Sequence, residues 1–157
     1  MGVSGSGKST LGKALAQMLR WDFFDADDFH SDANIVKMAA GIPLDDSDRT
    51  PWLAKLHDQL ISTLQAGRHP VLACSALKEK YRAQLLGGMD HIAVIHLKGT
   101  YDMIWSRMSA RQGHYMKPAM LQSQFATLEE PEGALVLDVS MPLDEMLDTI
   151  MKYYVMQ

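Results

Sequence analysis

The chain has 157 residues, of which 47% are hydrophobic and 22% charged, and its net charge is −4. This balance is typical of a soluble protein, and the length predicts one domain spanning residues 1–157 with a substantial core. The acidic balance argues against nucleic acid as a partner, no apolar run reaches the length of a membrane span, and the single cysteine, Cys74, excludes an intramolecular disulfide. No signal peptide is visible, so we expect a cytoplasmic protein.

The chain opens on a phosphate-binding motif. Residues 2–9 read GVSGSGKS, which matches the pattern G-x-x-x-x-G-K-S. Its glycines allow a tight turn that points successive main-chain N–H groups at the phosphates of a nucleotide. Lys8 reaches the β- and γ-phosphates, and the Ser9 hydroxyl binds Mg²⁺. Apolar residues recur at helical spacing from Leu11 to Leu19, which predicts a helix whose dipole favours the same anion. The alternative is a flexible Gly/Ser-rich terminus.

Short apolar runs then alternate with segments of helical periodicity. Strands are predicted at residues 21–25, 70–75, 92–97 and 134–139, and helices at 31–40, 50–66, 78–86, 101–111, 119–128 and 143–154. Strands that alternate with helices form right-handed βαβ units. The predicted class is therefore α/β, with a parallel sheet covered by helices on both faces.

One element is missing from this pattern. A phosphate loop is expected to follow a buried strand, but only Met1 precedes the motif. Either a strand has been omitted or the sheet lacks its central member. We therefore expect a truncated first strand, which would deprive the loop of its anchor.

Five aspartates crowd the end of the first predicted strand: Asp22, Asp25, Asp27, Asp28 and Asp32. Ligands bind at the carboxyl ends of strands in open α/β sheets. Asp25 and Asp27 are two residues apart and share a face in an extended segment. Phosphoryl transfer needs one carboxylate near Mg²⁺ and one that deprotonates the acceptor hydroxyl. No acid follows the strand at 70–75, so Asp25 is the best metal candidate; a solvated acidic loop is the alternative.

Basic residues gather in two other places. Arg107 and Arg111 lie four residues apart on one predicted helix, before a break at Gly113. An arginine on such a segment suits a lid that neutralises charge on the transferred phosphoryl group, although an exposed helix surface is the alternative. Arg49, Lys78 and Arg82 could hold an acidic substrate, because arginine binds carboxylates through two hydrogen bonds. Each of these three alone is more typical of a surface.

Several blocks of the sequence resemble gluconate kinases of the short phosphate-loop type, which are related to shikimate and adenylate kinases. They are GVSGSGKST, DADDFHSDANIVKMAAGIPLDDSDRTPWL, ACSALKEKYR, LKGTYDMIWSRMSARQGHYM and QFATLEEP. The resemblance implies the three-layer P-loop nucleoside triphosphate hydrolase-type fold with a five-stranded parallel sheet. It also implies a substrate-binding segment near residues 27–50 and a lid near 111–128. The implied reaction transfers the γ-phosphoryl group of ATP to the 6-hydroxyl of D-gluconate, and family members are commonly dimers.

The resemblance also implies roles for matched positions. Lys8, Asp27 and Arg111 would be catalytic, with Asp27 meeting the acceptor hydroxyl, and Ser9 and Asp25 would hold Mg²⁺. Gluconate would contact Asp27, His30, Arg49, Lys78 and Arg82. The nucleotide would be bound by Gly2, Ser4, Gly5, Ser6, Gly7, Lys8, Ser9, Thr10, Arg107 and Pro142.

The chain departs from the family pattern after His30, where residues 31–33 read SDA in place of a stretch that often carries basic residues. The acceptor is therefore less well defined than the donor. Two alternatives stay open: another small-molecule kinase, for shikimate or a different sugar acid, or a nucleotide-binding protein inactivated by loss of its first strand.

Overall fold

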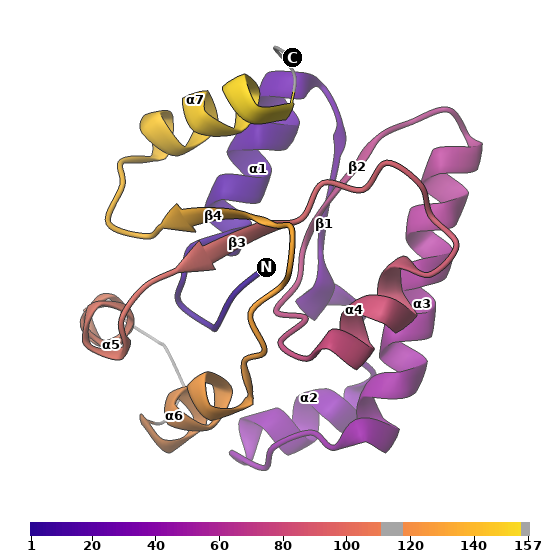
Figure 1. The fold of residues 1–157 in the computed structure, drawn as a ribbon. Coiled ribbons are helices and arrows are strands. Elements are labelled where there is room, and N and C mark those ends of the chain that lie inside the picture. Colours follow the sequence, from indigo (N-terminus) through magenta and orange to yellow (C-terminus); the bar gives the residue numbers. More distant parts are fainter. Residues whose placement is uncertain (111–117, 155–157) are drawn as a thin grey trace.

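A computed structural model describes residues 1–110 and 118–154 (Figure 1). Every predicted strand and helix is present, with ends shifted by up to four residues. The strands are β1 (Asp22–Asp25), β2 (Pro70–Ala73), β3 (Ile95–Lys98) and β4 (Leu135–Asp138). The helices are α1 (Lys8–Leu19), α2 (Asp32–Ala39), α3 (Asp46–Gln65), α4 (Glu79–Leu86), α5 (Tyr101–Ser109), α6 (Pro118–Thr127) and α7 (Leu143–Tyr154), and a 3₁₀ turn, η1, covers Ala26–Phe29.

The strands form two parallel pairs. In one pair Asp22 lies opposite Pro70 and Asp25 opposite Ala73, and in the other Ile95 lies opposite Leu135. In the part of the chain that the structure describes, these pairs are two separate two-stranded sheets, β1-β2 and β3-β4. The parallel α/β architecture is confirmed, but the five-stranded sheet implied by the family resemblance is not continuous.

Met1 and Gly2 lie between the two sheets. The Met1 nitrogen donates to the Ile95 oxygen, the Leu97 nitrogen donates to the Met1 oxygen at 2.9 Å, and the Gly2 nitrogen donates to the Ser75 oxygen at 3.4 Å. Figure 1 shows the N-terminus in this central position. Met1 and Gly2 therefore bridge β3 and the end of β2.

Helices cover the strands on two sides. In Figure 1, α1 and α7 lie on one side of the strands, and α3 and α4 lie on the other. Each side has its own core. The core under α1 and α7 includes Leu11, Leu97, Leu137, Val139 and Ile150, and the core under α3 and α4 includes Leu53, Leu56, Leu60, Tyr81 and Leu85.

Helix α3 begins four residues before the predicted helix at 50–66. Its start is fixed by a capping box: the Asp48 nitrogen donates to the Asp45 side chain, and the Asp45 nitrogen donates to the Asp48 side chain, each at 3.0 Å. Pro51 consequently lies inside the helix, beyond the first turn in which proline is usually found. The start of α3 is therefore set by the capping box of Asp45 and Asp48, and not by Pro51.

Two leucines of α3 test which side of the helix packs on the core. Leu53 is fully enclosed, at 0% exposure, so Leu53→Ala is expected to lower the free energy of unfolding by about 2–5 kcal/mol. Leu64 lies on the same helix but is 37% exposed, so Leu64→Ala is expected to cost about 1 kcal/mol or less. Urea unfolding measures both. Equal losses would contradict the side of α3 assigned to the core.

Candidate functional site

The phosphate loop has the backbone conformation that its glycines predict. Gly5 and Gly7 have φ values of 78° and 97°, in the left-handed region that favours glycine, and Gly7 caps α1. A Cβ atom at Gly5 would lie 2.4 Å from Cγ of Met108 in α5. The loop therefore packs directly on α5 and leaves no room for a side chain at this position.

The loop forms one wall of a cavity of about 320 Å³. The end of α2, the first half of α3 and the helix α6 contribute to the other walls. Ten of the predicted site residues line this cavity: Ser4, Gly5, Gly7, Lys8, Ser9, Thr10, Asp25, Asp27, His30 and Arg49. The structure thus brings together the predicted phosphate-binding residues and the predicted acceptor-binding residues.

Lys8, Ser9 and Asp25 form the polar floor of the cavity. Lys8 Nζ donates to the Val3 oxygen at 2.9 Å, and burial lowers the pKa of Lys8, while the nearby Asp27 carboxylate partly offsets that effect. Ser9 Oγ donates to Asp25 Oδ2 at 2.5 Å. The Asp27 nitrogen donates to Asp25 Oδ1 at 3.2 Å, so both Asp25 oxygens are oriented.

This floor offers the oxygen ligands that Mg²⁺ prefers. Mg²⁺ in nucleotide sites is held by one or two protein oxygens, together with substrate phosphates and water. Ser9 Oγ and Asp25 form such a pair. Over residues 1–110 and 118–154, no cluster of three or more His, Cys, Asp or Glu could hold a metal ion by itself. The residues fit a metal ion that takes its remaining ligands from bound phosphates.

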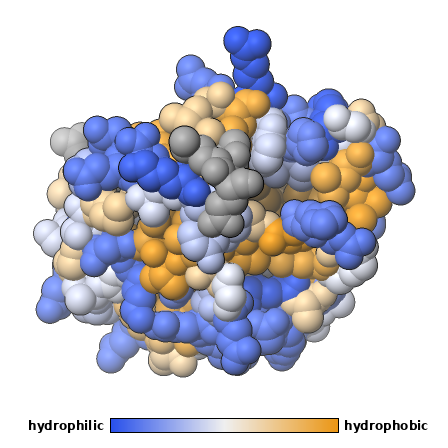
Figure 2. All heavy atoms as spheres, turned by 45° about the horizontal axis from the view of Figure 1, so that its top comes forward, coloured by the Kyte–Doolittle hydropathy of each residue, from blue (hydrophilic) through white to orange (hydrophobic). Residues whose placement is uncertain are grey.

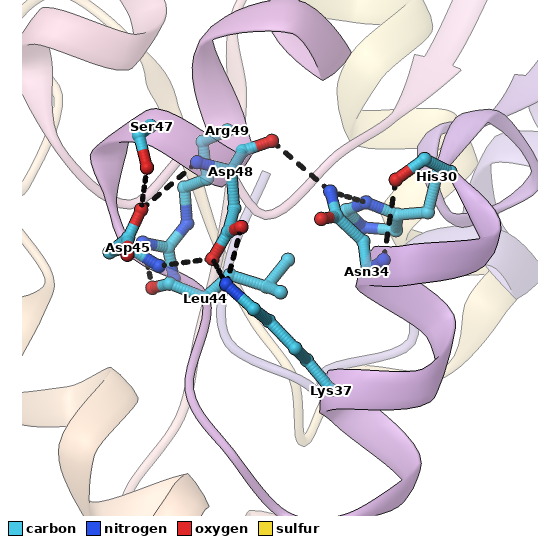
Figure 3. Close-up of polar contacts among 9 residues, drawn as sticks. His30, Asn34, Lys37, Leu44, Asp45, Ser47, Asp48 and Arg49 are labelled. Atoms are coloured by element: carbon cyan, nitrogen blue, oxygen red, sulfur yellow. Dashed lines mark hydrogen bonds and ion pairs between the residues drawn. The ribbon is translucent and has the colours of Figure 1, made fainter.

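His30 also lines the cavity and is held in a fixed orientation. Its ring stacks on Trp52, with the ring centroids 4.4 Å apart and the planes 11° from parallel. Trp52 Nε1 donates to the Ala26 oxygen at 2.8 Å. Asn34 Nδ2 lies 3.5 Å from His30 Nδ1, and the same amide donates to the main-chain oxygen of Asp48 at 3.1 Å (Figure 3). The amide can donate to Nδ1 when the ring proton is on Nε2.

A charged contact joins α2 to the start of α3. Lys37 Nζ donates to both carboxylate oxygens of Asp48, at 2.7 and 2.8 Å. Figure 3 shows this pair beside the capping contact of Asp45 and the backbone contact of Arg49, whose Nη1 donates to the Leu44 oxygen. Asn34 and Lys37 of α2 therefore both contact Asp48 of α3, which sets the position of α2 relative to α3.

Tyr81 of α4 contacts the guanidinium of Arg49. Arg49 Nη1 lies 3.4 Å from the Tyr81 hydroxyl, which donates to Asp46 Oδ1 at 2.6 Å. Hydrogen bonds from Lys80 and Tyr81 lower the pKa of Asp46 to about 2. The ionised Asp46 thereby orients the hydroxyl that borders Arg49.

Two predicted substrate residues lie elsewhere. Arg82 was expected in the substrate pocket, but it is buried outside the cavity, where its guanidinium donates to the Ala76 oxygen at 3.0 Å and to Glu79 Oε2 at 2.6 Å. Its charge stabilises the turn after β2, because the carbonyl groups there need a donor. Lys78 does not line the cavity either, and its Nζ lies 5.7 Å from the centre of the Tyr81 ring.

The remaining predicted nucleotide residues lie around the loop or beyond it. Gly2 packs on Leu97 and Ser6 is buried beneath the loop, so neither lines the cavity. Arg107 and Pro142 also lie outside the cavity. Hydrogen bonds from Ser140 lower the pKa of Asp138, and the Arg107 charge adds to that effect, which places Arg107 near the segment after β4. Arg111 falls outside the described residues.

Gln124 and Trp52 are among the cavity residues that sequence reasoning missed. The Ser4 nitrogen of the phosphate loop donates to Oε1 of Gln124 in α6, at 2.7 Å. Gln124 belongs to the QFATLEEP block, which was the only signal for it. Trp52 reads as a core residue and is indeed buried, but it also lines the cavity beneath His30.

Known proteins resemble this chain over most of its length. A family profile described as shikimate kinase matches residues 4–133. A probable gluconokinase from Mus musculus is 45% identical over 97% of this chain and 94% of its own length. The chain belongs to the gluconokinase family. A gluconokinase structure from Sinorhizobium meliloti 1021 has a TM-score of 0.83 and 42% identity, covering 94% of this chain and 85% of that one.

A sugar kinase structure from Janibacter sp. HTCC2649 has a TM-score of 0.91 at 42% identity, covering 98% of this chain and 90% of that one. Membership in the gluconokinase family makes the protein a kinase with the P-loop fold. In the part of the chain that the structure describes, no helix is both long enough and apolar enough to cross a membrane.

The pKa of His30 gives a measurable property of the site. Burial lowers this pKa below the ordinary value of 6.5, so the folded state favours the neutral ring. The unfolded state then binds more protons just below pH 6.5, and the contribution of His30 to stability is lost as the pH falls from there toward the folded pKa. NMR titration of the histidines is expected to place the midpoint of His30 below 6.5.

His30→Gln identifies the His30 signal and serves as the control for stability. Between pH 7 and 5, the free energy of unfolding of the wild type is expected to fall by more than that of His30→Gln. A midpoint at 6.5 or above would show that the ring is not held in the buried, neutral form.

Proposed function

We propose that this protein transfers the γ-phosphoryl group of ATP to the 6-hydroxyl of D-gluconate, giving 6-phosphogluconate and ADP. The observation that carries the proposal is the shared cavity: Lys8, Ser9 and Asp25 lie on one side of it, and Asp27, His30 and Arg49 line it with them. A donor site and an acceptor site that open into one cavity are what direct phosphoryl transfer requires.

On the donor side, Lys8 and the loop amides would bind the phosphates of ATP. Mg²⁺ held by Ser9 and Asp25 would neutralise charge on those phosphates. Arg111 would add positive charge to the transferred group, and Arg107 and Pro142 would border the adenine. Residues 111–128 would act as the lid; within that range, Gln124 already contacts the loop at Ser4.

On the acceptor side, Asp27 would orient the 6-hydroxyl and take its proton. Asp27 lies two residues after the end of β1 and lines the cavity together with Asp25 and Lys8. Arg49 would bind the gluconate carboxylate, because a guanidinium matches a carboxylate with two parallel hydrogen bonds. His30 would donate from Nε2 to a substrate oxygen, since Asn34 contacts its other nitrogen.

Asp27, His30 and Arg49 all belong to the proposed substrate-binding segment, residues 27–50, and all line the cavity. The names of the relatives support gluconate, and the geometry supports a small anionic acceptor. A cytoplasmic location and a homodimer also stay proposals that rest on the family resemblance.

A panel of acceptors tests the proposal. Purified protein with ATP and Mg²⁺ is expected to release ADP with gluconate, and to release little with shikimate or nucleoside monophosphates, in a coupled ADP assay. Equal or faster turnover of another acceptor would favour a different small-molecule kinase. ATP binding without acceptor-dependent ADP release would favour a nucleotide-binding protein without turnover.

Asp27 provides a test of the mechanism. Asp27→Asn is expected to lower turnover by about 10²–10⁴-fold and to leave ATP affinity nearly unchanged, because proton transfer matters mainly in the transition state. Asp28→Asn is the matched control, since Asp28 is exposed and does not line the cavity. Turnover and ATP affinity are measured by the coupled assay and by calorimetry. Unchanged turnover in Asp27→Asn would remove Asp27 from the mechanism.

A further inference from the structure

Helix α6 carries one residue that contacts the phosphate loop directly. Oε1 of Gln124 accepts a hydrogen bond from the Ser4 nitrogen at 2.7 Å, and both residues line the cavity. A main-chain N–H group can only donate, so the carboxamide of Gln124 must present its oxygen to Ser4. The other branch of the carboxamide is Nε2, which carries two N–H donors. Gln124 therefore takes up one donor of the loop and offers two donors of its own.

The position of Gln124 is fixed by the anchoring of α6. Leu121, one turn earlier on the helix, is fully buried in the core under α1 and α7. Just beyond the helix, the Glu129 nitrogen donates to the Leu77 oxygen at 2.8 Å, and Glu129 Oε2 accepts from the Glu79 nitrogen at 2.6 Å. A side chain on an anchored helix has less freedom than one on a loop. The Gln124 carboxamide is thus held in place beside the phosphate loop.

The contact with Ser4 places Gln124 near the γ end of the proposed nucleotide site. Lys8 is the loop residue that reaches the β- and γ-phosphates. Its Nζ donates to the Val3 oxygen at 2.9 Å. The Val3 oxygen and the Ser4 nitrogen belong to the same peptide group, so Lys8 and Gln124 both bind this one group. A terminal phosphate bound by Lys8 would therefore lie beside the peptide group that Gln124 contacts.

The surroundings of Gln124 favour a polar, anionic ligand. Ser123 and Thr127 of the same helix line the cavity with it, and so does Lys8. Figure 2 shows patches of apolar residues on the surface that is turned forward from the top of Figure 1, whereas α6 lies at the bottom of Figure 1. Neutral N–H donors that act together with an ammonium group are typical of sites that bind phosphate oxygens.

We propose that Nε2 of Gln124 donates a hydrogen bond to an oxygen of the γ-phosphoryl group of ATP, so that α6 contributes a residue to the site of transfer. This inference rests on the proposed donor site. During transfer, the bond between the γ-phosphorus and the oxygen of ADP breaks, a bond to the acceptor oxygen forms, and the acceptor proton passes to Asp27. Gln124 exchanges no proton. It stabilises charge on the moving group, and its fixed position avoids reorganisation during the reaction.

Two substitutions separate this role from a purely structural contact. Gln124→Glu keeps an oxygen that accepts from Ser4, but it removes both N–H donors and adds a negative charge. Gln124→Met removes the acceptor as well. Gln122→Glu is the matched control, since Gln122 is exposed on α6 and does not line the cavity. We expect Gln124→Glu to have the Tm of this control, and Gln124→Met to have a Tm lower by about 2–4 °C through loss of one hydrogen bond.

The decisive readout is the affinity for two nucleotides without an acceptor. Calorimetry in the presence of Mg²⁺ measures binding of ADP and of a non-hydrolysable analogue of ATP. In Gln124→Glu, the affinity for the ATP analogue is expected to fall about tenfold or more, and the affinity for ADP to change by less than about twofold, because only the analogue has a γ-phosphoryl group. The Gln122→Glu control is expected to keep both wild-type affinities. With gluconate as acceptor, kcat of Gln124→Glu is expected to fall about 10²-fold or more.

An unchanged ratio of the two affinities in Gln124→Glu would overturn the inference and leave Gln124 as a residue that only holds α6 against the loop. A gain of affinity for the ATP analogue in Gln124→Met would also overturn it, because the Gln124 oxygen would then occupy the place of a phosphate. Since no acceptor is present, the ratio decides the inference whichever small molecule the protein phosphorylates. Absence of nucleotide binding by the wild type would overturn the inference together with the proposed function.

Discussion

The site depends on three main-chain hydrogen bonds made by Met1 and Gly2. They tie the start of the phosphate loop to β3 on one side and to the end of β2 on the other. Since β2 pairs in register with β1, the same contacts fix the loop relative to Asp25, the last residue of β1. The 2.5 Å hydrogen bond between Ser9 and Asp25 is a consequence of that placement. A shift of the loop along β3 would separate these two groups.

The two halves of the cavity are held by different forces. The loop is fixed by glycine conformations and by close packing on Met108, where a single added carbon would not fit. The acceptor half is fixed by polar contacts, among them Lys37 with Asp48 and Asn34 with the Asp48 oxygen. The pair of Lys37 with Asp48 is partly exposed and therefore individually weak. The acceptor half is therefore the part more easily reshaped by substitution.

The sequence was informative where a single local rule decides the structure. The phosphate loop follows from glycine positions, and the strands and helices follow from apolar periodicity. The sequence was less informative where a residue far away in the chain determines the position of a side chain. The pattern of α2 places Ile35 inward, yet Ile35 is 49% exposed and Asn34 is buried, because the amide binds the Asp48 oxygen. Nothing local reveals that the Ala76 and Leu77 oxygens accept from Arg82, so its place outside the cavity does not follow from the sequence.

The charge of the cavity explains how a chain with a net charge of −4 can accept two anions. Burial lowers the pKa of Lys8, and the carboxylates of Asp27 and Asp25 partly restore it. A bound polyphosphate would favour the protonated amine further, so phosphate binding and protonation of Lys8 support each other. His30 is held neutral and recognises oxygen without adding charge. Positive charge is therefore concentrated on Lys8 and Arg49, at the two places where the anionic groups of the substrates are proposed to bind.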